Sequence, residues 1–225
     1  MSGNIFPESI SFTHAMIPDI IEPIAAVLDK IGVKYFPIGS AAYPIDGKVS
    51  NDLDIMVDLN DLRSYFDPPE AFEKTLRSFL SIEFKAAGFR TAQTGVCVHV
   101  AVPIDDSVYQ VDIMTVQDAE NISFYHQHNV PRGSKYKGFN KILALARLAK
   151  EQGLMWSPYK GLFKRSEPTK IFLSSDPTEV ANILLGPGSD PESLRNVESI
   201  LNALGSDRGS TLLNKLQADI NWKEF

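Results

Sequence analysis

The alternation of apolar and polar positions predicts four β-strands in the first half of the chain. Residues 33–38, 53–59, 95–103 and 108–116 carry apolar, often β-branched residues at every second position or in short runs. This pattern is typical of strands with one or both faces buried. The sequence Asp-Asp-Ser at 105–107 separates the last two runs and is typical of a hairpin turn. These two strands are therefore expected to pair with each other.

Helical spacing predicts four helices, over residues 18–31, 67–83, 136–152 and 192–204. In the first of them apolar residues recur every three or four positions, as in a helix that buries one face. The second begins with Asp67 as a candidate cap and two prolines in its first turn, a common helix start. A polar tail is expected after the fourth. Helices combined with an antiparallel hairpin predict an α+β fold with helices packed against one mixed sheet.

Length and composition fit a globular protein without a membrane partner. The chain has 225 residues, 44% of them hydrophobic, enough for one core or two small domains. It has no apolar run long enough to cross a bilayer, and its polar, acidic N-terminus differs from a secretory signal. The single cysteine, Cys97, excludes an internal disulfide and indicates a cytoplasmic protein. Cys97 is expected to pack as a small apolar side chain. His126 and His128, which no other metal-binding residues accompany, are expected in a loop or at the surface.

Three aspartates in the predicted strands form a candidate metal site. Strand side chains alternate between faces, so Asp52 and Asp54 project from one face while their apolar neighbours point to the other. Asp112 lies on another strand among apolar residues, where an unpaired charge is costly and a metal ion would satisfy it. A Gly-Ser turn, Gly39 and Ser40, precedes the first two aspartates. Carboxylates arranged in this way suit two hard cations such as Mg²⁺. The alternative is a set of ordinary turn or surface charges.

The net charge of −6 hides an uneven distribution. Residues 1–129 carry eight Lys and Arg against 18 Asp and Glu, residues 130–170 carry ten against two, and residues 171–225 carry four against eight. A basic block inside an acidic protein is typical of a site for polyphosphate or nucleic acid. The alternative is a solvated, lysine-rich helix face.

These motifs resemble the nucleotidyltransferase superfamily of DNA polymerase beta. Gly39-Ser40, then Asp52 and Asp54 two apart, then a distant strand-borne Asp112 match the pattern of that superfamily. The resemblance covers about residues 33–187, and its second half is similar to the thumb of the family X DNA polymerases. The segments that carry this second half are Arg132-Gly133-Ser134, Ala149 to Leu154, Trp156 to Phe163 and Ser175 to Gly186.

The resemblance implies a domain order and a role for each matching residue. It implies a palm over residues 1–130, a thumb-like α/β subdomain over 131–187 and a C-terminal helix and tail over 188–225. Asp52, Asp54 and Asp112 would hold two Mg²⁺ ions, for which Mn²⁺ can substitute, and Asp112 would accept the proton of the attacking hydroxyl. The substrates would be a nucleoside triphosphate and a DNA or RNA 3′ end. Contacts to the nucleotide are implied for Gly39, Ser40, Gly133, Ser134 and Asn140. The basic block offers Arg132, Lys135, Lys137, Lys141 and Arg147 as contacts to nucleic acid.

The chain departs from the family X pattern at several points. Ala41 to Pro44 replace the basic residues that follow Gly-Ser in the family, which leaves Lys48 as the candidate contact to the triphosphate. Val130-Pro131 replaces a Tyr-Phe pair, and the thumb arginine aligns with Ala146. The family's lyase domain has no counterpart before the predicted palm.

Three functions are compatible with the sequence. The first is a minimal family X-like DNA polymerase or terminal transferase, which the basic block favours. The second is a nucleotidyltransferase that modifies a tRNA, a protein or a small molecule, which the acidic remainder of the chain favours. The third is an inactive binding module, which the intact set of three aspartates disfavours.

Overall fold

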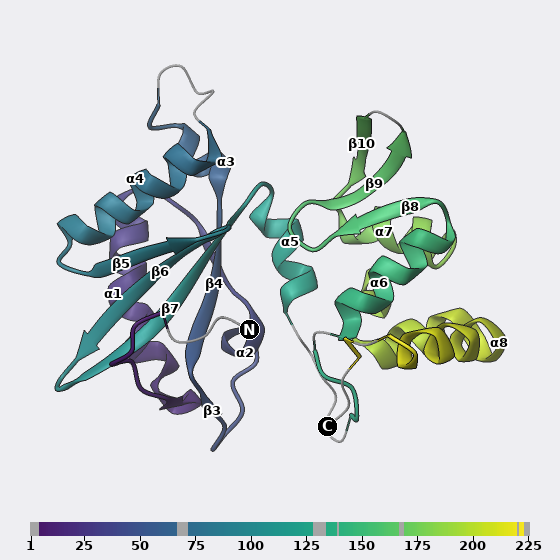
Figure 1. Ribbon diagram of the computed structural model, residues 1–225, viewed down its shortest axis with the longest axis horizontal. Helices are drawn as coiled ribbons and strands as arrows, with labels where there is room; N and C mark the ends of the chain where they lie inside the picture. The colour runs from purple at the N-terminus through teal and green to yellow at the C-terminus, as the bar shows by residue number, and fades with distance from the viewer. Residues whose placement is uncertain are drawn as a thin grey trace. The chain divides into compact units, whose positions relative to one another are not determined.

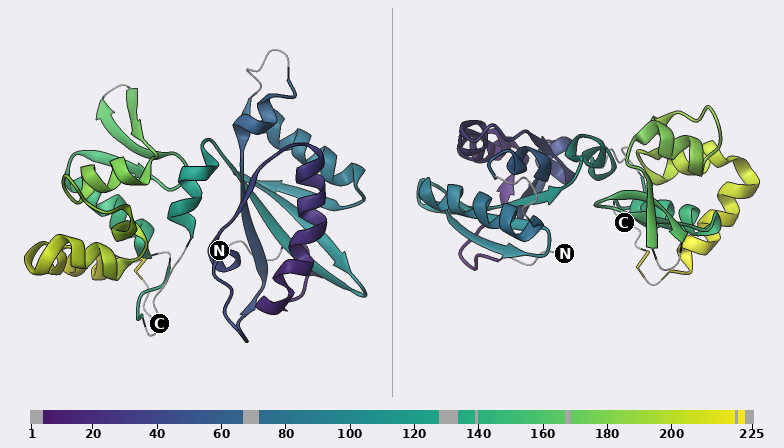
Figure 2. Two further views of the ribbon diagram at one scale, coloured as in Figure 1. Left: turned by 180° about the vertical axis from the view of Figure 1, so that it is seen from behind. Right: turned by 90° about the horizontal axis from the view of Figure 1, so that it is seen from above.

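The computed structural model describes residues 5–66, 72–127, 134–138, 140–166, 169–219 and 221–222, with the backbone alone at Ser40. The chain divides into two compact units, Met1–Ser123 and Phe124–Phe225, and each has its own sheet (Figures 1 and 2). Residues 188–225, which the sequence sets apart, lie within the second unit. Within the described ranges, the helices are all too short or too polar to cross a membrane.

The first unit is built on a five-stranded mixed sheet. The strand order is β2 (Tyr35–Pro37), β4 (Asp52–Asp58), β7 (Ser107–Val116), β6 (Cys97–Ile104) and β5 (Arg90–Thr94). β4 and β7 are parallel, and every other neighbouring pair is antiparallel. The four strands that alternation predicts are present, as is the β6–β7 hairpin, and β5 is additional. The mixed sheet with helices confirms the α+β class.

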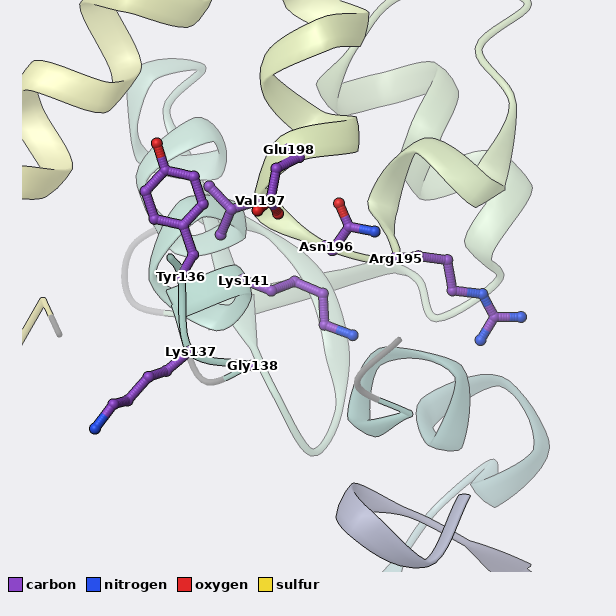
Figure 3. Close-up of a pocket in the computed structure, with 8 residues that line it drawn as sticks. All are labelled: Tyr136, Lys137, Gly138, Lys141, Arg195, Asn196, Val197 and Glu198. Carbon is purple, nitrogen blue, oxygen red and sulfur yellow. The ribbon is translucent and has the colours of Figure 1, made fainter. Parts of the chain in front are cut away.

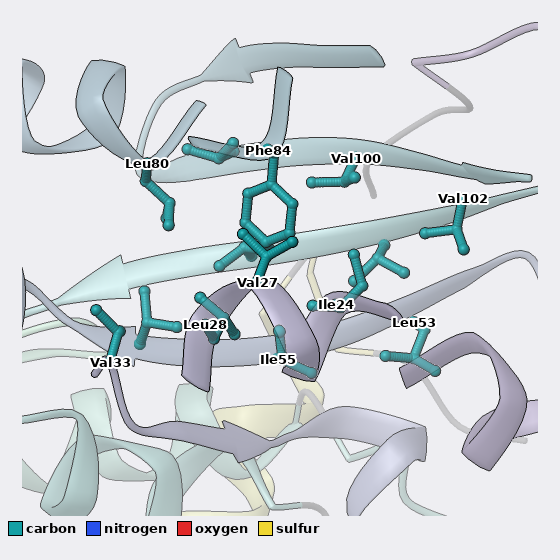
Figure 4. Close-up of a cluster of buried hydrophobic side chains, with 14 of the residues drawn as sticks. Ile24, Val27, Leu28, Val33, Leu53, Ile55, Leu80, Phe84, Val100 and Val102 are labelled. Atoms are coloured by element: carbon teal, nitrogen blue, oxygen red, sulfur yellow. The ribbon is translucent and has the colours of Figure 1, made fainter. Parts of the chain in front are cut away.

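Helices α1 (Ile17–Lys30) and α4 (Glu73–Ala86) bury the apolar side of this sheet. Figure 4 shows Ile24 of α1 and Phe84 of α4 directed toward Leu53 of β4 and Val100 of β6, all fully buried. Alternation along the strands sends these apolar residues to one side, so the polar residues between them lie on the other side. The predicted helix 18–31 is confirmed. The helix predicted from residue 67 is confirmed from Glu73 onward, and its proposed start at 67–71 lies outside the described residues.

Short elements complete the first unit. They are β1 (Phe12–Thr13) paired with β3 (Val49–Ser50), the 3-10 helix η1 (His14–Met16), α2 (Gly39–Ala42), α3 (Leu59–Arg63) and α5 (Ala119–His126), which continues into the second unit. Asp58 caps α3, since its carboxylate accepts from the backbone N–H of Asn60 at 2.7 Å. The same side chain accepts from the N–H of Ala119 at 2.8 Å, so it ties the end of β4 to the start of α5.

The second unit combines a small antiparallel sheet with helices. Its strands are β8 (Leu154–Ser157), β9 (Gly161–Ser166) and β10 (Thr169–Ser174), in the order β10-β9-β8. Its helices are α6 (Asn140–Glu151), α7 (Pro177–Leu184), the 3-10 helix η2 (Pro191–Leu194) and α8 (Val197–Gln217). Tyr125 is fully buried here, packs edge-on against Trp156 at 4.6 Å between ring centroids, and donates to the carbonyl of Ser175 at 3.0 Å.

Two predictions for the second unit are wrong. The helix predicted over 192–204 begins only at Val197, after Asn196 caps it in a capping box, and continues to Gln217 through a break at Gly205 (φ 74°). The expected polar tail is therefore largely helical, because Leu212 and Leu216 supply a buried face beyond that break. His126 is buried rather than at the surface: its Nε2 donates to the carbonyl of Pro158 at 2.7 Å. His128 lies outside the described residues.

A glycine at the start of β9 allows the close approach of two strands. Gly161 has φ +89°, and a Cβ there would lie 2.5 Å from the backbone oxygen of Ser174. Gly161→Ala is expected to lower the free energy of unfolding by about 3 kcal/mol, because strain and a backbone clash add. Gly153→Ala is the matched control: φ is +71°, yet no atom lies within 4 Å of the added Cβ, so about 1 kcal/mol is expected. Urea denaturation measures both, and equal losses would contradict the close approach.

Candidate active site

The parallel pairing of β4 with β7 brings the predicted aspartates together. Asp54 lies directly opposite Asp112, and Asp52 lies opposite Gln110. Register partners share a face of the sheet, so the three carboxylates project from the same side, away from the apolar core. Asp112 is only 3% exposed, and the other two side chains are half-buried. The site therefore gathers three carboxylates on neighbouring strands.

The charges of this group act on one another. The pKa of Asp54 is raised from its usual 3.8 to about 7, first by burial, then by the negative charges of Asp52 and Asp112. The nearby imidazole of His99 acts in the opposite direction. A carboxylate whose ionisation is opposed by burial and by two like charges is stabilised by a bound cation. Asp54 is therefore the residue on which a divalent ion would have the largest effect.

Asp112 is hydrogen-bonded by the chain itself, contrary to the expectation that a metal ion alone would satisfy it. Its Oδ1 accepts from Nδ1 of His99 at 2.7 Å and from the side-chain amide of Gln110 at 2.9 Å. The other ring nitrogen of His99 lies 2.5 Å from the hydroxyl of Thr94. Both ring nitrogens of His99 are therefore held by hydrogen-bond partners, which fixes the orientation of the ring. Asp112 is thus fixed through one oxygen, and Oδ2 is the oxygen that a metal ion or a proton can take.

His99 is a site residue that the sequence analysis missed, although a signal was present. In a hairpin that turns at Asp105-Asp106, residues at equal distances from the turn lie opposite one another. His99 therefore pairs with Asp112. Cys97 lies two residues before His99 and shares its face. The pKa of the Cys97 thiol is raised to about 12 by burial, then by Asp112 and Asp54. The thiol therefore stays protonated at neutral pH and is not a nucleophile.

Gly39 places backbone against the carboxylate of Asp54. Its φ is +56°, and a Cβ at this position would lie 3.0 Å from Oδ2 of Asp54, so only glycine fits here without strain. Ser40 follows in α2. Lys48 lies in the exposed turn before β3, and its charge contributes, after burial, to lowering the pKa of His14. Gly39 therefore joins the carboxylates, whereas Lys48 lies near His14.

The predicted nucleotide contacts of the second half lie in the second unit. The Ser134 hydroxyl donates to the carboxylate of Glu198 and accepts from the N–H of Tyr136 at 3.0 Å. Asn140 is fully buried at the first position of α6. Gly133 lies outside the described residues. Ser134 thus fixes the segment before α6 to the start of α8.

The surface role predicted for Lys141 is wrong. Lys141 is 1% exposed, because it shares a face of α6 with Leu145 and Ala149. Its ammonium group donates to the carbonyl of Gln127 at 3.3 Å, and its pKa is lowered to about 7 by burial, then by the charge of Arg195. Lys141 is one of the residues that line a small cavity (Figure 3). The volume of this cavity is about 10 Å³, which leaves room for no more than one water molecule.

The other predicted nucleic-acid contacts are distributed along the same part of the chain. Lys135 is exposed, with its ammonium 5.2 Å from the centre of the Tyr136 ring. Lys137 is half-buried. Arg147 is half-exposed and 3.7 Å from Glu151, one turn further along α6. Arg132 lies outside the described residues. Lys135 is therefore the most accessible of the described candidates.

Hard oxygen donors are present for Mg²⁺ at the carboxylates. Asp52, Asp54 and Oδ2 of Asp112 are ligands of the type that Mg²⁺ prefers, and the register of β4 with β7 places Asp54 opposite Asp112. In the part of the chain that the structure describes, no three His, Cys, Asp or Glu side chains lie close enough together to hold a metal ion. By its chemistry, the set of oxygen donors suits the ion.

The sequence was compared with known proteins. No protein-family model matches it, and no curated protein gives a significant match. The carboxylates on β4 and β7 are therefore the structural basis for assigning a function.

Proposed function

We propose that this protein is a divalent-metal-dependent nucleotidyltransferase of the DNA polymerase beta type. The observation that carries the proposal is the position of Asp54. Its carboxylate lies beside Gly39, and its pKa is raised by burial and by the charges of Asp52 and Asp112. In the proposed reaction a hydroxyl oxygen attacks the α-phosphorus of a nucleoside triphosphate. The bond from that phosphorus to the bridging oxygen breaks, and pyrophosphate leaves. Bound Mg²⁺ would lower the pKa of the hydroxyl and neutralise charge on the leaving group.

The protein's own residues would position the reactants and accept the proton. Asp52, Asp54 and Asp112 would hold Mg²⁺. Oδ1 of Asp112 accepts hydrogen bonds from His99 and Gln110, so Oδ2 would be the oxygen that accepts the proton of the attacking hydroxyl. The fixed side chain keeps that oxygen in one orientation, which favours in-line attack.

The acceptor in this proposal is the 3′ end of a nucleic acid. The basic block at 130–170, with ten Lys and Arg against two Asp and Glu, supports a polyanionic acceptor. The acidic first half of the chain supports the second candidate, a tRNA, protein or small-molecule acceptor.

Incorporation of labelled nucleoside triphosphates tests the function and separates these acceptors. The panel contains single-stranded, primed and gapped DNA and RNA, mixed tRNA, and the protein alone, each with Mg²⁺ or Mn²⁺. Label transferred to a 3′ end supports the first candidate, and label transferred to protein or tRNA supports the second. No metal-dependent transfer or pyrophosphate release with any acceptor would contradict the proposal.

His99 is proposed as a positioning residue for Asp112. His99→Ala is expected to lower the transfer rate by roughly 10- to 100-fold, because residues that orient a metal ligand have effects of that size. His99→Asn places an amide donor near the position of Nδ1 and is expected to restore much of that loss. The titration of Mn²⁺ supplies a second readout, since weaker metal binding in the Ala variant should recover in the Asn variant. Equal activity of both variants with the wild type would contradict the role.

A further inference from the structure

The β9–β10 hairpin exposes an unusual surface of aromatic and basic side chains. β8 pairs only with Gly161–Lys164 of β9, so the far end of the hairpin, including Arg165, extends beyond β8 (Figure 1). β10 is one of the two edge strands of the sheet. Its residues Ile171 and Phe172 are 50% and 53% exposed. Because successive side chains of a strand alternate between its faces, each face of β10 carries at least one large exposed apolar side chain.

Phe172 forms an aromatic platform on one face of the hairpin. It lies opposite Phe163 of β9, and the two rings meet edge to face with 5.5 Å between their centroids. Phe163 is partly covered and supports Phe172, which is half-exposed. A supported, exposed phenyl ring is the kind of surface on which an unpaired nucleic-acid base stacks.

Two cations lie next to this platform. Arg165 of β9 and Lys170 of β10 are also directly opposite each other, so they share the face of the two phenylalanines, and both are exposed. Like charges placed directly opposite across two strands destabilise the hairpin. The three strands carry Lys164, Arg165 and Lys170 and no carboxylate, while Glu167 lies between β9 and β10, outside the described residues. A bound phosphate between Arg165 and Lys170 would relieve the repulsion.

We propose that this hairpin surface, formed by Phe163, Phe172, Arg165 and Lys170, binds single-stranded nucleic acid. Unpaired bases stack on Phe172, and the backbone phosphates contact Arg165 and Lys170. A duplex does not fit this mode of binding, because its bases are already stacked in pairs. The inference deepens the proposed function, since it rests on a nucleic-acid acceptor, and it specifies an acceptor that is unpaired where it meets the hairpin. The nucleic-acid contacts that the sequence predicts around α6 play no part in this binding.

Fluorescence anisotropy tests this surface without catalysis. The full-length protein is titrated, without Mg²⁺, against labelled 12-nucleotide single-stranded DNA and RNA and against a duplex of equal length, at several salt concentrations. The single strands are expected to bind more tightly than the duplex. Phe172→Ala is expected to weaken single-strand binding by about 10- to 100-fold, as for loss of one stacked base. The double variant Arg165→Gln with Lys170→Gln is expected to flatten the dependence of log K on log salt by about 1.4, as for two phosphate contacts.

Matched controls distinguish this surface from a general effect. Phe72 is 83% exposed in the first unit, so Phe72→Ala removes an exposed ring elsewhere. Lys74→Gln with Lys85→Gln removes two exposed charges from α4. Both controls are expected to bind as the wild type does. Equal loss in the controls, unchanged binding in the hairpin variants, or tighter binding of the duplex would overturn the proposal. Loss of self-association in Phe172→Ala with unchanged oligonucleotide binding would assign the hairpin surface to a protein contact and would also overturn the proposal.

The hairpin surface and the carboxylate site can be tested separately. Asp54→Asn is expected to bind the oligonucleotides normally, because Asp54 belongs to the carboxylate site. If transfer to a 3′ end proceeds while the hairpin variants bind normally, the hairpin proposal fails and the enzyme proposal stands. If the hairpin binds single strands but no metal-dependent transfer occurs, the reverse holds.

Discussion

Replacing Asp54 with Asn is expected to abolish nucleotidyl transfer and to raise the melting temperature of the protein. The pKa of Asp54 rises from 3.8 to about 7 on folding, through burial and the charges of Asp52 and Asp112. Between pH 3.8 and about pH 7, Asp54 is therefore protonated in the folded state and ionised in the unfolded state. The free energy of unfolding falls as pH rises through this range and stays low above pH 7. Asn has a similar shape and no charge, so the variant escapes this destabilisation.

The size of the effect follows from the shift in pKa. A rise from 3.8 to about 7 corresponds to roughly 4 kcal/mol at full burial. The side chain is half-buried, so about 2 kcal/mol is expected, or a rise in Tm of roughly 4–8 °C for a chain of this size. The gain should be largest at pH 8 without Mg²⁺ and should disappear near pH 4. Asp106→Asn, in the exposed β6–β7 turn, is the control and should change neither Tm nor activity. An active Asp54→Asn variant, or one that melts below the wild type at pH 8, would contradict this description of the site.

Lys141→Met is expected to stabilise the protein, most strongly at acidic and neutral pH. Lys141 is buried, and its pKa is lowered from 10.5 to about 7 by burial and by Arg195. The unfolded state binds more protons than the folded state between these values, so the stability of the wild type rises with pH from about 7 to 10.5. Below pH 7 the folded protein must bury an ammonium group whose hydrogen bond to the carbonyl of Gln127 is long, at 3.3 Å. Met fills nearly the same volume without a charge.

Thermal melts from pH 5.5 to 10 measure this effect. The full shift corresponds to roughly 5 kcal/mol, and relaxation around the amine is expected to reduce it to about 3 kcal/mol at pH 6. The difference between variant and wild type should shrink steadily as pH approaches 10. Lys150→Met, at an exposed position of the same helix, should shift Tm little at any pH. A Lys141→Met variant that is less stable than the wild type at pH 6 would show that the amine stabilises the fold.

The sequence predicted those elements whose pattern of apolar residues matches the face that they bury in the fold. Strands β4, β6 and β7 alternate or run apolar because one face is buried by α1 and α4, so periodicity locates them. β10 could not be located in this way, since its apolar residues Ile171, Phe172 and Leu173 are consecutive and largely exposed. The end of α8 was missed because Gly205 interrupts a helix that tertiary packing continues.

The candidate site was predictable as far as strand geometry determines it. The shared face of Asp52 and Asp54 follows from alternation, and the partner of Asp112, His99, follows from the hairpin register. The pairing of Asp54 with Asp112 could not be derived, because it depends on which strands become neighbours in the sheet. The burial of Lys141 could not be predicted from a count of charges along the chain, because it depends on which residues of the second unit cover that face of α6.

Binding of Mn²⁺ to the carboxylate site tests the central claim most directly. Electron paramagnetic resonance measures free Mn²⁺ as the protein is titrated, with and without a nucleoside triphosphate whose α–β bridge cannot be cleaved. We predict that the wild type and Asp106→Asn bind Mn²⁺ in the presence of this nucleotide, and that Asp54→Asn and Asp112→Asn bind at least tenfold more weakly. Equal binding by all four proteins, or no binding by the wild type, would contradict the assignment of Asp52, Asp54 and Asp112 as the metal site.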